Sequence, residues 1–384
     1  MISTAHQIEL KPNNKQANYL ARACGVARFS YNWALAQWKE QYQAYQQDNN
    51  LPKPNEQALR KKFNAIKKQE FSFVGEVTKY ASQQAIKDLG TSFKRFFKGE
   101  AKYPQFHKKG HHDSFYIGND QFKVKNKQVW IPNLGWVKTK ESFLFEGKGK
   151  INNAVISRHA NKWLVSISVS VEEKLPRCTI EKQDCVGVDL GISHLATCSD
   201  GHTADNPQAL RKNLKKLKRL GQALSRKVKG SHNRHKAKMQ LAKVHQRIKN
   251  LRKDALHKLS YYVTTRFKTV VLEDLNVQGM LKNRKLSRAI ADVGFYELRR
   301  QIEYKAKYYG AEIKYANRFY PSSKLCSSCS FKHEGLTLKE RVWDCPQCDN
   351  HHDRDLNAAL NLKQLGLLAV SSTVTACGEF GSGV

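Results

Sequence analysis

The amino-acid sequence predicts a multidomain α+β protein, and three observations support this fold class. Polar and apolar residues alternate over about 101–172, which predicts an antiparallel β-unit. Residues 11–99 carry apolar side chains at steps of three and four, which predicts a small helical unit. Short apolar runs at 184–201 and 269–275 flank a long basic stretch and predict buried strands of a second part. A chain of 384 residues has room for two or three such domains.

The N-terminal half is expected to hold one strand, three helices and then the β-unit. A strand covers 3–10, Asn13 or Asn14 caps a helix that reaches Gln47, and further helices cover 55–68 and 76–98, the last ending at Gly99. We expect the β-unit to form a small barrel with a turn at Ala160–Lys162. Strand 3–10 would join this barrel, so that the helices are an insertion between its first and second strands.

The C-terminal half is expected to alternate strands and helices. Two strands joined by a turn cover 184–201, a basic helical hairpin covers 207–266 with its bend at Gly230–Ser231, and a strand covers 269–275. A helix at 291–309, a strand at 311–317 and a last helix at 354–365 follow, with a loose tail from about 370.

Positive charge dominates the composition, with 67 Lys and Arg against 33 Asp and Glu, a net charge of +34. Such an excess predicts a polyanionic partner, and nucleic acid fits best. Nine cations lie in 211–229 and nine in 234–258, and Asp254 is the one acid within 211–260. The alternative, a solvated helix face, is weaker because nothing inside the segment neutralises these charges. A membrane partner is disfavoured, since no run of about 18 apolar residues and no signal peptide is found.

Four of the nine cysteines form the pattern C-x2-C-x15-C-x2-C at Cys326, Cys329, Cys345 and Cys348. Two such turns can close a tetrahedral shell of four thiolates, which predicts a structural zinc site with no open position. A redox dithiol and an iron–sulfur cluster are the alternatives. An odd cysteine count without an export signal favours a reducing cytosol. Lys324 and Arg341 are expected to offset the negative sulfur shell.

Three acids are candidates for a catalytic metal site. Asp189 and Glu273 each lie in an apolar strand, where a carboxylate is costly unless it is paired or binds a cation. Asp355 shares a helix face with apolar residues, whereas Asp353 precedes the first turn and suits an N-cap, so Asp355 is the preferred third ligand. Asp274 should point to the other side of its strand and is excluded. Three carboxylates can hold two magnesium ions, although each acid taken alone is more often a cap or an ion-pair partner.

Together these motifs resemble the TnpB (OrfB) family of nucleases encoded by insertion sequences, which are relatives of type V CRISPR effectors. The resemblance rests on VGVDLGISHLATCSDG, VVLEDLNVQGM, the paired C-x-x-C motifs and HDRDLNAALNL, and on SQQAIKDLGTSFKRFF followed by KYPQFHKK. It covers about residues 1–365.

The resemblance implies a fold, a domain plan and a set of catalytic residues. A RuvC-like nuclease domain of the RNase H fold would carry Asp189, Glu273 and Asp355 as catalytic residues and Mg²⁺ ligands, with the zinc element inserted before the third acid. The implied domains are a wedge-like barrel at 1–10 and 100–175, a helical recognition insert at 11–99, the nuclease at 180–324 and 349–368, the zinc element at 325–348 and a flexible tail at 369–384.

The implied activity is RNA-guided DNA cleavage. A guide RNA from the transposon end, a target-adjacent motif in double-stranded DNA, two Mg²⁺ ions and one structural Zn²⁺ would be needed, in the cytoplasm and on the nucleoid of a bacterium. Candidate nucleic-acid contacts are Lys79, Gln83, Gln84, Arg95, Arg211, Lys215, Arg219 and Arg226. A catalytically silent RNA-guided regulator and a conventional transposase are the alternative functions, and a solvated helix face is the alternative for Lys79, Gln83 and Gln84.

Overall fold

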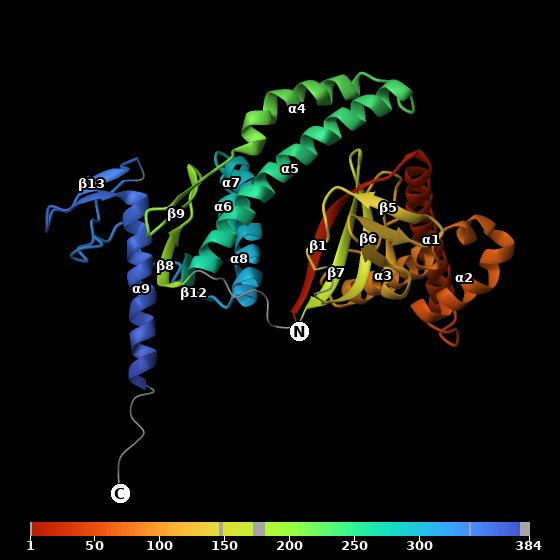
Figure 1. The fold of residues 1–384 in the computed structure, drawn as a ribbon, viewed down its shortest axis with the longest axis horizontal. Coiled ribbons are helices and arrows are strands. Elements are labelled where there is room, and N and C mark those ends of the chain that lie inside the picture. The colour runs from red at the N-terminus through yellow and green to blue at the C-terminus, as the bar shows by residue number, and fades with distance from the viewer. Residues whose placement is uncertain (1, 146–148, 172–180, 338, 377–384) are drawn as a thin grey trace, which may run out of the picture. The chain divides into compact units, whose positions relative to one another are not determined.

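The computed structural model describes residues 2–145, 149–171, 181–337 and 339–376, which belong to two compact units (Figure 1). The first unit spans Met1–Glu173 and the second spans Lys174–Val384. Each unit has its own sheet and its own buried core. Among the described helices, none is both long enough and apolar enough to cross a bilayer.

A seven-stranded antiparallel sheet forms the centre of the first unit. Its strands are β1 (Ile2–Lys11), β2 (Ser114–Gly118), β3 (Lys123–Lys125), β4 (Gln128–Ile131), β5 (Gly135–Thr139), β6 (Gly149–His159) and β7 (Lys162–Val171), in the order β2-β6-β7-β1-β5-β4-β3. Every second residue of β7 is buried, which is the alternation that predicted a strand. β1 pairs with both β7 and β5, so the expected role of the first strand is confirmed. The hydrogen-bonded order begins at β2 and ends at β3, so closure into a barrel stays a prediction.

Except for the short 3₁₀ helix η2 (Asn119–Gln121), the described helices of the first unit lie between β1 and β2 in the chain. They are α1 (Asn14–Gln47), α2 (Glu56–Glu70), the 3₁₀ helix η1 (Ser72–Glu76) and α3 (Lys79–Phe97). Asn13, one of the two caps that the sequence offered, caps α1 in a capping box with Gln16. The Tyr19 hydroxyl donates to the carbonyl of Pro132 at 2.6 Å and accepts from the Thr78 amide at 3.0 Å. This one side chain therefore links α1, the start of α3 and a loop of the sheet.

A five-stranded mixed sheet forms the centre of the second unit. Its strands are β8 (Gln183–Asp189), β9 (His194–Cys198), β10 (Thr203–Asp205), β11 (Phe267–Glu273) and β12 (Glu312–Ala316), in the order β10-β9-β8-β11-β12. β9 runs antiparallel to β8 and β10, whereas β11 is parallel to β8 and to β12. β8 and β11 are covered on both faces, which explains why their sequences are continuous apolar runs.

Helices cover both faces of this sheet. Val186 and Leu272 pack toward α5 (His232–Arg266) and α8 (Phe295–Tyr309), in a core that includes Val263 and Leu298. Cys185 and Val271 point to the opposite face, where they pack against Leu362 of α9 (Arg354–Ala376). In Figure 1, α9 runs beside β8 and β9.

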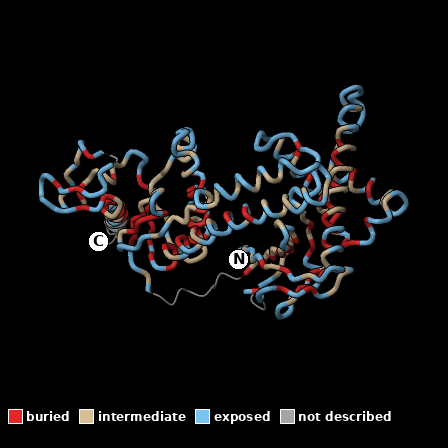
Figure 2. Tube along the Cα trace, turned by 90° about the horizontal axis from the view of Figure 1, so that it is seen from above, coloured by how far each residue is buried: buried red, intermediate tan, exposed pale blue. Residues whose placement is uncertain are grey.

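The basic segment is a helical hairpin of α4 (Ala209–Ser225) and α5, which confirms the predicted bend at Gly230–Ser231. Ser231 caps α5 through the amide of Arg234. The buried carboxylate of Asp292 accepts from the backbone amides of Leu210 and Arg211 and so caps α4. Most of the hairpin is exposed or half-buried along its length (Figure 2).

Two sequence expectations need correction. The expected helix at 291–309 is two helices, α7 (Ser287–Val293) and α8, because Gly294 takes a left-handed conformation with φ of 79° between them. The last helix does not end at 365, since α9 continues to Ala376, where a loose tail was expected from about 370. Residues 377–384 of that tail lie outside the described residues. α6 (Val277–Leu281) and the hairpin of β13 (Val342–Asp344) and β14 (His351–Asp353) complete the unit.

Candidate active site and metal centre

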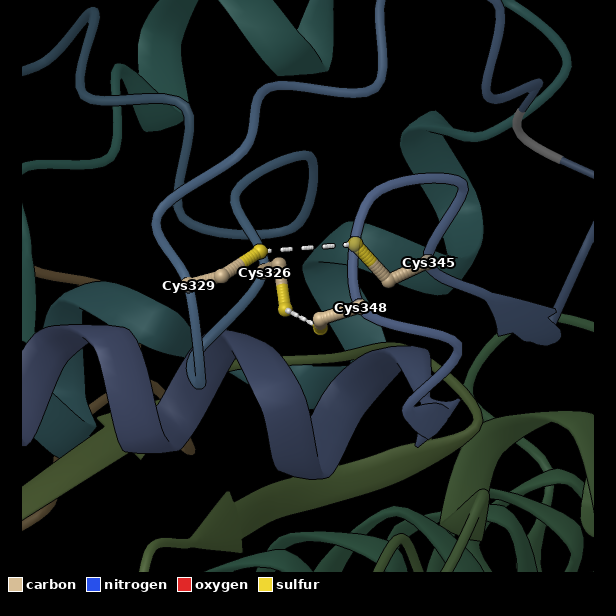
Figure 3. A group of neighbouring side chains, drawn as sticks. All are labelled: Cys326, Cys329, Cys345 and Cys348. Carbon is tan, nitrogen blue, oxygen red and sulfur yellow. Dashed lines mark hydrogen bonds between the residues drawn. The ribbon is translucent and has the colours of Figure 1, made fainter.

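The four cysteines of the two C-x-x-C motifs converge, as their spacing predicted (Figure 3). Their Sγ atoms all lie within 4.8 Å of one another, with 3.7 Å between Cys326 and Cys348 and 3.5 Å between Cys329 and Cys345. A tetrahedral zinc with Zn–S bonds of about 2.3 Å requires sulfur–sulfur separations of about 3.8 Å. The cluster therefore has the donor set and the spacing of a structural zinc site.

The loop that carries the first cysteine pair is attached to α9 by hydrogen bonds. The side chain of Asn357 accepts from the Ser327 amide at 2.9 Å and donates to the Leu325 carbonyl at 2.6 Å. Asn361, one turn further along α9, donates to the same carbonyl at 2.7 Å. Both asparagines are buried, so these bonds are shielded from water. The cysteine knuckle and the last helix are thus one connected element.

His352 is a residue of this element that the sequence reasoning missed. Its Nε2 lies 3.1 Å from Cys326 Sγ, and its ring packs beside Trp343 at 4.7 Å between ring centres. His352 could have been noticed in the sequence, because it lies four residues after the last cysteine of the motif. It was not considered as a ligand because the four cysteines already complete a tetrahedral zinc shell. Arg341 was expected to offset the sulfur charge. Instead its guanidinium contacts a carboxylate oxygen of Asp355 at 3.1 Å.

The structure brings Asp189 and Glu273 to the same edge of the second sheet. Val188 of β8 and Leu272 of β11 are paired in parallel register, and each acid follows its paired residue directly. Cys185 and Val271 face α9, and side chains of one strand alternate between the two faces. Asp189 and Glu273 are four and two residues further along, so both lie toward α9.

Asp355 enters from the first turn of α9. Asp353 precedes it and caps the helix, because its Oδ1 accepts from the Leu356 amide at 2.9 Å, as predicted. α9 packs tightly against β8 at Gly187, where a Cβ atom would lie 2.0 Å from the carbonyl oxygen of Ala359. Only glycine fits at this contact. The close approach sets the position of Asp355 relative to Asp189.

The electrostatics show that the three acids share one environment. Burial raises the pKa of Asp189 to about 8, and the carboxylates of Glu273 and Asp355 contribute to the rise. Glu273 accepts a hydrogen bond from Ser322 Oγ at 2.6 Å, a partner that the sequence did not indicate.

Asp274 has different surroundings from its neighbour Glu273. Arg318 donates to its Oδ2 at 2.7 Å and Arg299 to its Oδ1 at 3.1 Å. These two guanidinium groups lower the pKa of Asp274. The acid is engaged in a local ion-pair network, which agrees with its exclusion from the metal site.

The candidate nucleic-acid contacts fall into two groups. Lys79, Gln83, Gln84 and Arg95 lie on α3 of the first unit, and Arg211, Lys215, Arg219 and Arg226 lie on or at the end of α4 of the second. Lys79 forms an ion pair with Asp120 at 3.5 Å and lines a cavity of about 410 Å³. The α4 cations are exposed. The roles of both groups in binding nucleic acid therefore stay predictions.

Three family models match the chain. They are described as "Probable transposase" over residues 166–284, "Cas12f1-like, TNB domain" over 295–362 and "Helix-turn-helix domain" over 1–47. A "Putative RNA-guided DNA endonuclease" of Streptomyces pristinaespiralis is 35% identical and aligns over 98% of this chain and 92% of its own. The "Putative RNA-guided DNA endonuclease InsQ" of Escherichia coli K12 is 32% identical over 98% of this chain and 94% of its own.

A likeness in fold supports these matches. The structure titled "Cryo-EM structure of the Cas12f1-sgRNA-target DNA complex" superposes with a TM-score of 0.52 and 15% identity, over 91% of this chain and 83% of that chain. The multidomain α+β fold is therefore of the Cas12f kind. The chain belongs to the TnpB (OrfB) family of the IS605 type, which confirms the resemblance of its motifs.

Proposed function

We propose that this protein is an RNA-guided, magnesium-dependent DNA endonuclease whose catalytic residues are Asp189, Glu273 and Asp355. One observation carries the assignment of the site: three carboxylates from β8, β11 and α9 share one environment, in which the pKa of Asp189 rises to about 8. The two curated relatives described above are both named as RNA-guided DNA endonucleases.

The donor set suits magnesium. Crowded carboxylates repel one another and hold a proton when no cation is bound, and hard oxygen ligands are those that Mg²⁺ favours. When bound, two Mg²⁺ ions would activate a water molecule and stabilise the leaving oxygen of a phosphodiester. The protein's own contribution is orientation: Ser322 holds Glu273, Arg341 holds Asp355, and the contact at Gly187 fixes α9 against β8.

The fold supports the finer assignment of domains. The order β10-β9-β8-β11-β12, with three antiparallel strands followed by two parallel ones, fits a RuvC-like nuclease of the RNase H type. The first unit would be the wedge-like domain with its helical insert, which reads the target-adjacent motif. The α4–α5 hairpin would hold the guide RNA or the heteroduplex by its backbone, while base pairing supplies sequence specificity. The guide would come from the transposon end, and the protein would act on the bacterial nucleoid.

The test is to express the protein with its flanking transposon DNA and to sequence the RNA that copurifies. The complex is then given Mg²⁺ and a duplex that matches the 3′ end of that RNA beside a randomised flank. Cleavage that requires both the RNA and Mg²⁺ and is lost in Asp189→Ala supports the proposal. Target binding without cleavage by the unmodified protein would favour the silent regulator, and the absence of a discrete RNA would reject guided cleavage.

A further inference from the structure

A cavity of about 240 Å³ lies directly beside the candidate active site, within the second unit. Glu273 contributes to its wall, and Leu190, the residue after Asp189, contributes as well. The cavity therefore lies where β8 and β11 end. The acids direct their side chains toward α9, whereas the cavity lies on the α8 side of the same strand ends. A strand bound at the acids would therefore reach the cavity across the edge of the sheet.

The cavity has an apolar floor and an aromatic residue at its opening. The apolar surface comes from Leu272 of β11, from Leu190 directly after β8, and from Phe295 and Ile302 of α8. Tyr296, in the first turn of α8, also lines the cavity, and 74% of its surface is exposed. A large aromatic side chain left this open beside an apolar cavity offers a face on which a planar group can stack.

The arginines of the cavity do not offer free positive charge. Arg318 and Arg299 both bind Asp274, and Arg299 also donates to Glu303 at 3.0 Å. The guanidinium of Arg299 lies 4.2 Å above the ring of Tyr315, which fixes its plane. With these charges neutralised, a phosphate would be poorly held here. These contacts hold the arginine side chains in place, so this side of the cavity is rigid and electrically neutral and suits an uncharged group.

We propose that this cavity receives the base of a nucleotide adjacent to the phosphate that is cleaved, and that Tyr296 stacks on that base. The proposal rests on the proposed function, because it assumes that Asp189, Glu273 and Asp355 bind the scissile phosphate. A volume of about 240 Å³ is below the range of roughly 300–1,000 Å³ for pockets that enclose a whole ligand, so it suits a base with its sugar and phosphate outside. Stacking is tolerant of sequence, which a nuclease guided by base pairing requires.

Tyr296 is a positioning residue in this proposal, because it would turn the strand so that its phosphate faces the acids. The experiment uses the full protein with its guide RNA and target strands that carry a single abasic residue at successive positions around the cut. With the unmodified protein, one position next to the cut should slow cleavage by about 5- to 150-fold, the range for loss of one base–aromatic stack.

The variants identify the residue responsible. Tyr296→Ala should slow cleavage of the normal strand by a similar factor, and the abasic strand should then lose little more. Tyr296→Phe should keep most of the rate, because the ring is retained. Tyr304→Ala is the matched control, since Tyr304 is a half-exposed tyrosine of the same helix that does not line the cavity. Melting curves of the four proteins check folding.

The outcomes separate this proposal from the function on which it rests. If the unmodified complex shows no magnesium-dependent cleavage, the proposed function has failed. If it cleaves, but abasic residues within three positions of the cut have no effect, the cavity does not hold a base. Equal losses for Tyr296→Ala on normal and abasic strands would likewise reject stacking.

Discussion

Glu273 and Asp274 are adjacent acids that the structure places in different roles. Glu273 shares its environment with Asp189 and is held by Ser322, whereas Asp274 is bound by Arg299 and Arg318. The pair therefore offers a test of the site in which position along the chain, residue type and charge are almost matched.

Glu273→Gln should reduce cleavage by at least about a thousandfold, or about 4 kcal/mol of transition-state stabilisation, because a metal ligand is lost. Asp274→Asn should keep the rate within about tenfold, since it loosens only a supporting contact. Single-turnover cleavage at saturating Mg²⁺ measures both, and filter binding of the guide RNA checks assembly. Equal losses in the two variants would contradict the assignment of Glu273 as a ligand.

Lys305 gives a prediction for pH. It is 8% exposed, and its ammonium group donates to the His257 carbonyl and to Ser260 Oγ, both at 2.8 Å. Burial lowers its pKa from 10.5 to about 8. Between pH 8 and 10.5 the unfolded chain binds this proton and the folded chain releases it, so this group makes stability rise with pH across that window.

The gain should approach about 3 kcal/mol at the upper end of the window, since each pKa unit corresponds to about 1.4 kcal/mol. Urea unfolding at about pH 7.5 and about pH 9.5 measures the difference between the unmodified protein and Lys305→Met, in which this rise is missing. Lys307→Met, at an exposed position of the same helix, is the control. If both variants keep the same pH slope as the unmodified protein, the pKa of Lys305 is not lowered in the folded state.

Which site residues could be predicted depends on whether their signal is local. Asp189 and Glu273 stand out because an acid in an apolar strand is costly, and Asp355 because its helix face is apolar. Ser322 could not be found, since its partner Glu273 is 49 residues away and a lone serine carries no pattern. Asn357 and Asn361 were visible as polar residues inside an apolar helix, but only the folded loop shows what they bind.

At the scale of elements, the contact between α9 and β8 is the critical one. A Cβ atom at Gly187 would meet the Ala359 carbonyl oxygen at 2.0 Å, whereas nothing lies within 4 Å of a Cβ atom at Gly221 in α4. The first glycine is required by packing. The second is an open position in a helix, where alanine is favoured by about 1 kcal/mol.

Gly187→Ala should therefore push α9 away from β8, lower the melting temperature and reduce cleavage by at least about a hundredfold, because a misplacement of about 1 Å can cost that much. Gly221→Ala should keep the cleavage rate and raise the melting temperature slightly. Calorimetry and cleavage assays on the two purified variants compare them directly. An active Gly187→Ala protein would show that Asp355 does not need this contact.

The zinc element should support catalysis through α9, because Asn357 and Asn361 bind the cysteine loop. Cys348→Ser removes one sulfur ligand and should reduce both bound zinc and cleavage, the latter by at least about tenfold even in excess Mg²⁺. Cys348→His should restore both, since histidine also binds zinc and the position is exposed. Metal analysis by mass spectrometry accompanies the cleavage assay. Full cleavage by a zinc-free Cys348→Ser protein would contradict this coupling.

Element boundaries were predictable where a local residue defines them. Asn13, one of two candidate caps, precedes α1, and Gly230 lies in the bend of the hairpin, as the sequence indicated. Gly294 was missed because the apolar period continues across it, and only its left-handed backbone separates α7 from α8. The end of α9 was placed too early because helix-favouring residues continue into a segment whose small polar residues indicated a tail.

At the scale of the whole molecule, the sequence predicted the longer strands of both units, but it missed the short strands β10, β13 and β14 and did not predict how the strands are ordered. Alternation and apolar runs identify a strand by its own residues, whereas the order β10-β9-β8-β11-β12 depends on contacts between distant segments. Net charge differs from strand order, because it is the sum of the charged residues and can be calculated without knowing the fold. The net charge of +34 therefore predicts a nucleic-acid partner from the composition alone.

The positive charge leads to a last prediction, which concerns the α4–α5 hairpin. Lys215, Arg219 and Arg226 are exposed cations on or at the end of α4, whereas Lys258 of α5 is paired with Asp254 at 2.8 Å. If the hairpin contacts phosphates, each free cation releases counterions on binding, and the slope of log K against log salt concentration changes by about 0.7 to 0.9 per contact. Replacing the first three residues by alanine should reduce the slope by about 2, while Lys258→Ala should change it far less. Guide RNA affinity measured between about 50 mM and about 400 mM salt gives both slopes. An unchanged slope in the triple variant would mean that these cations only face water.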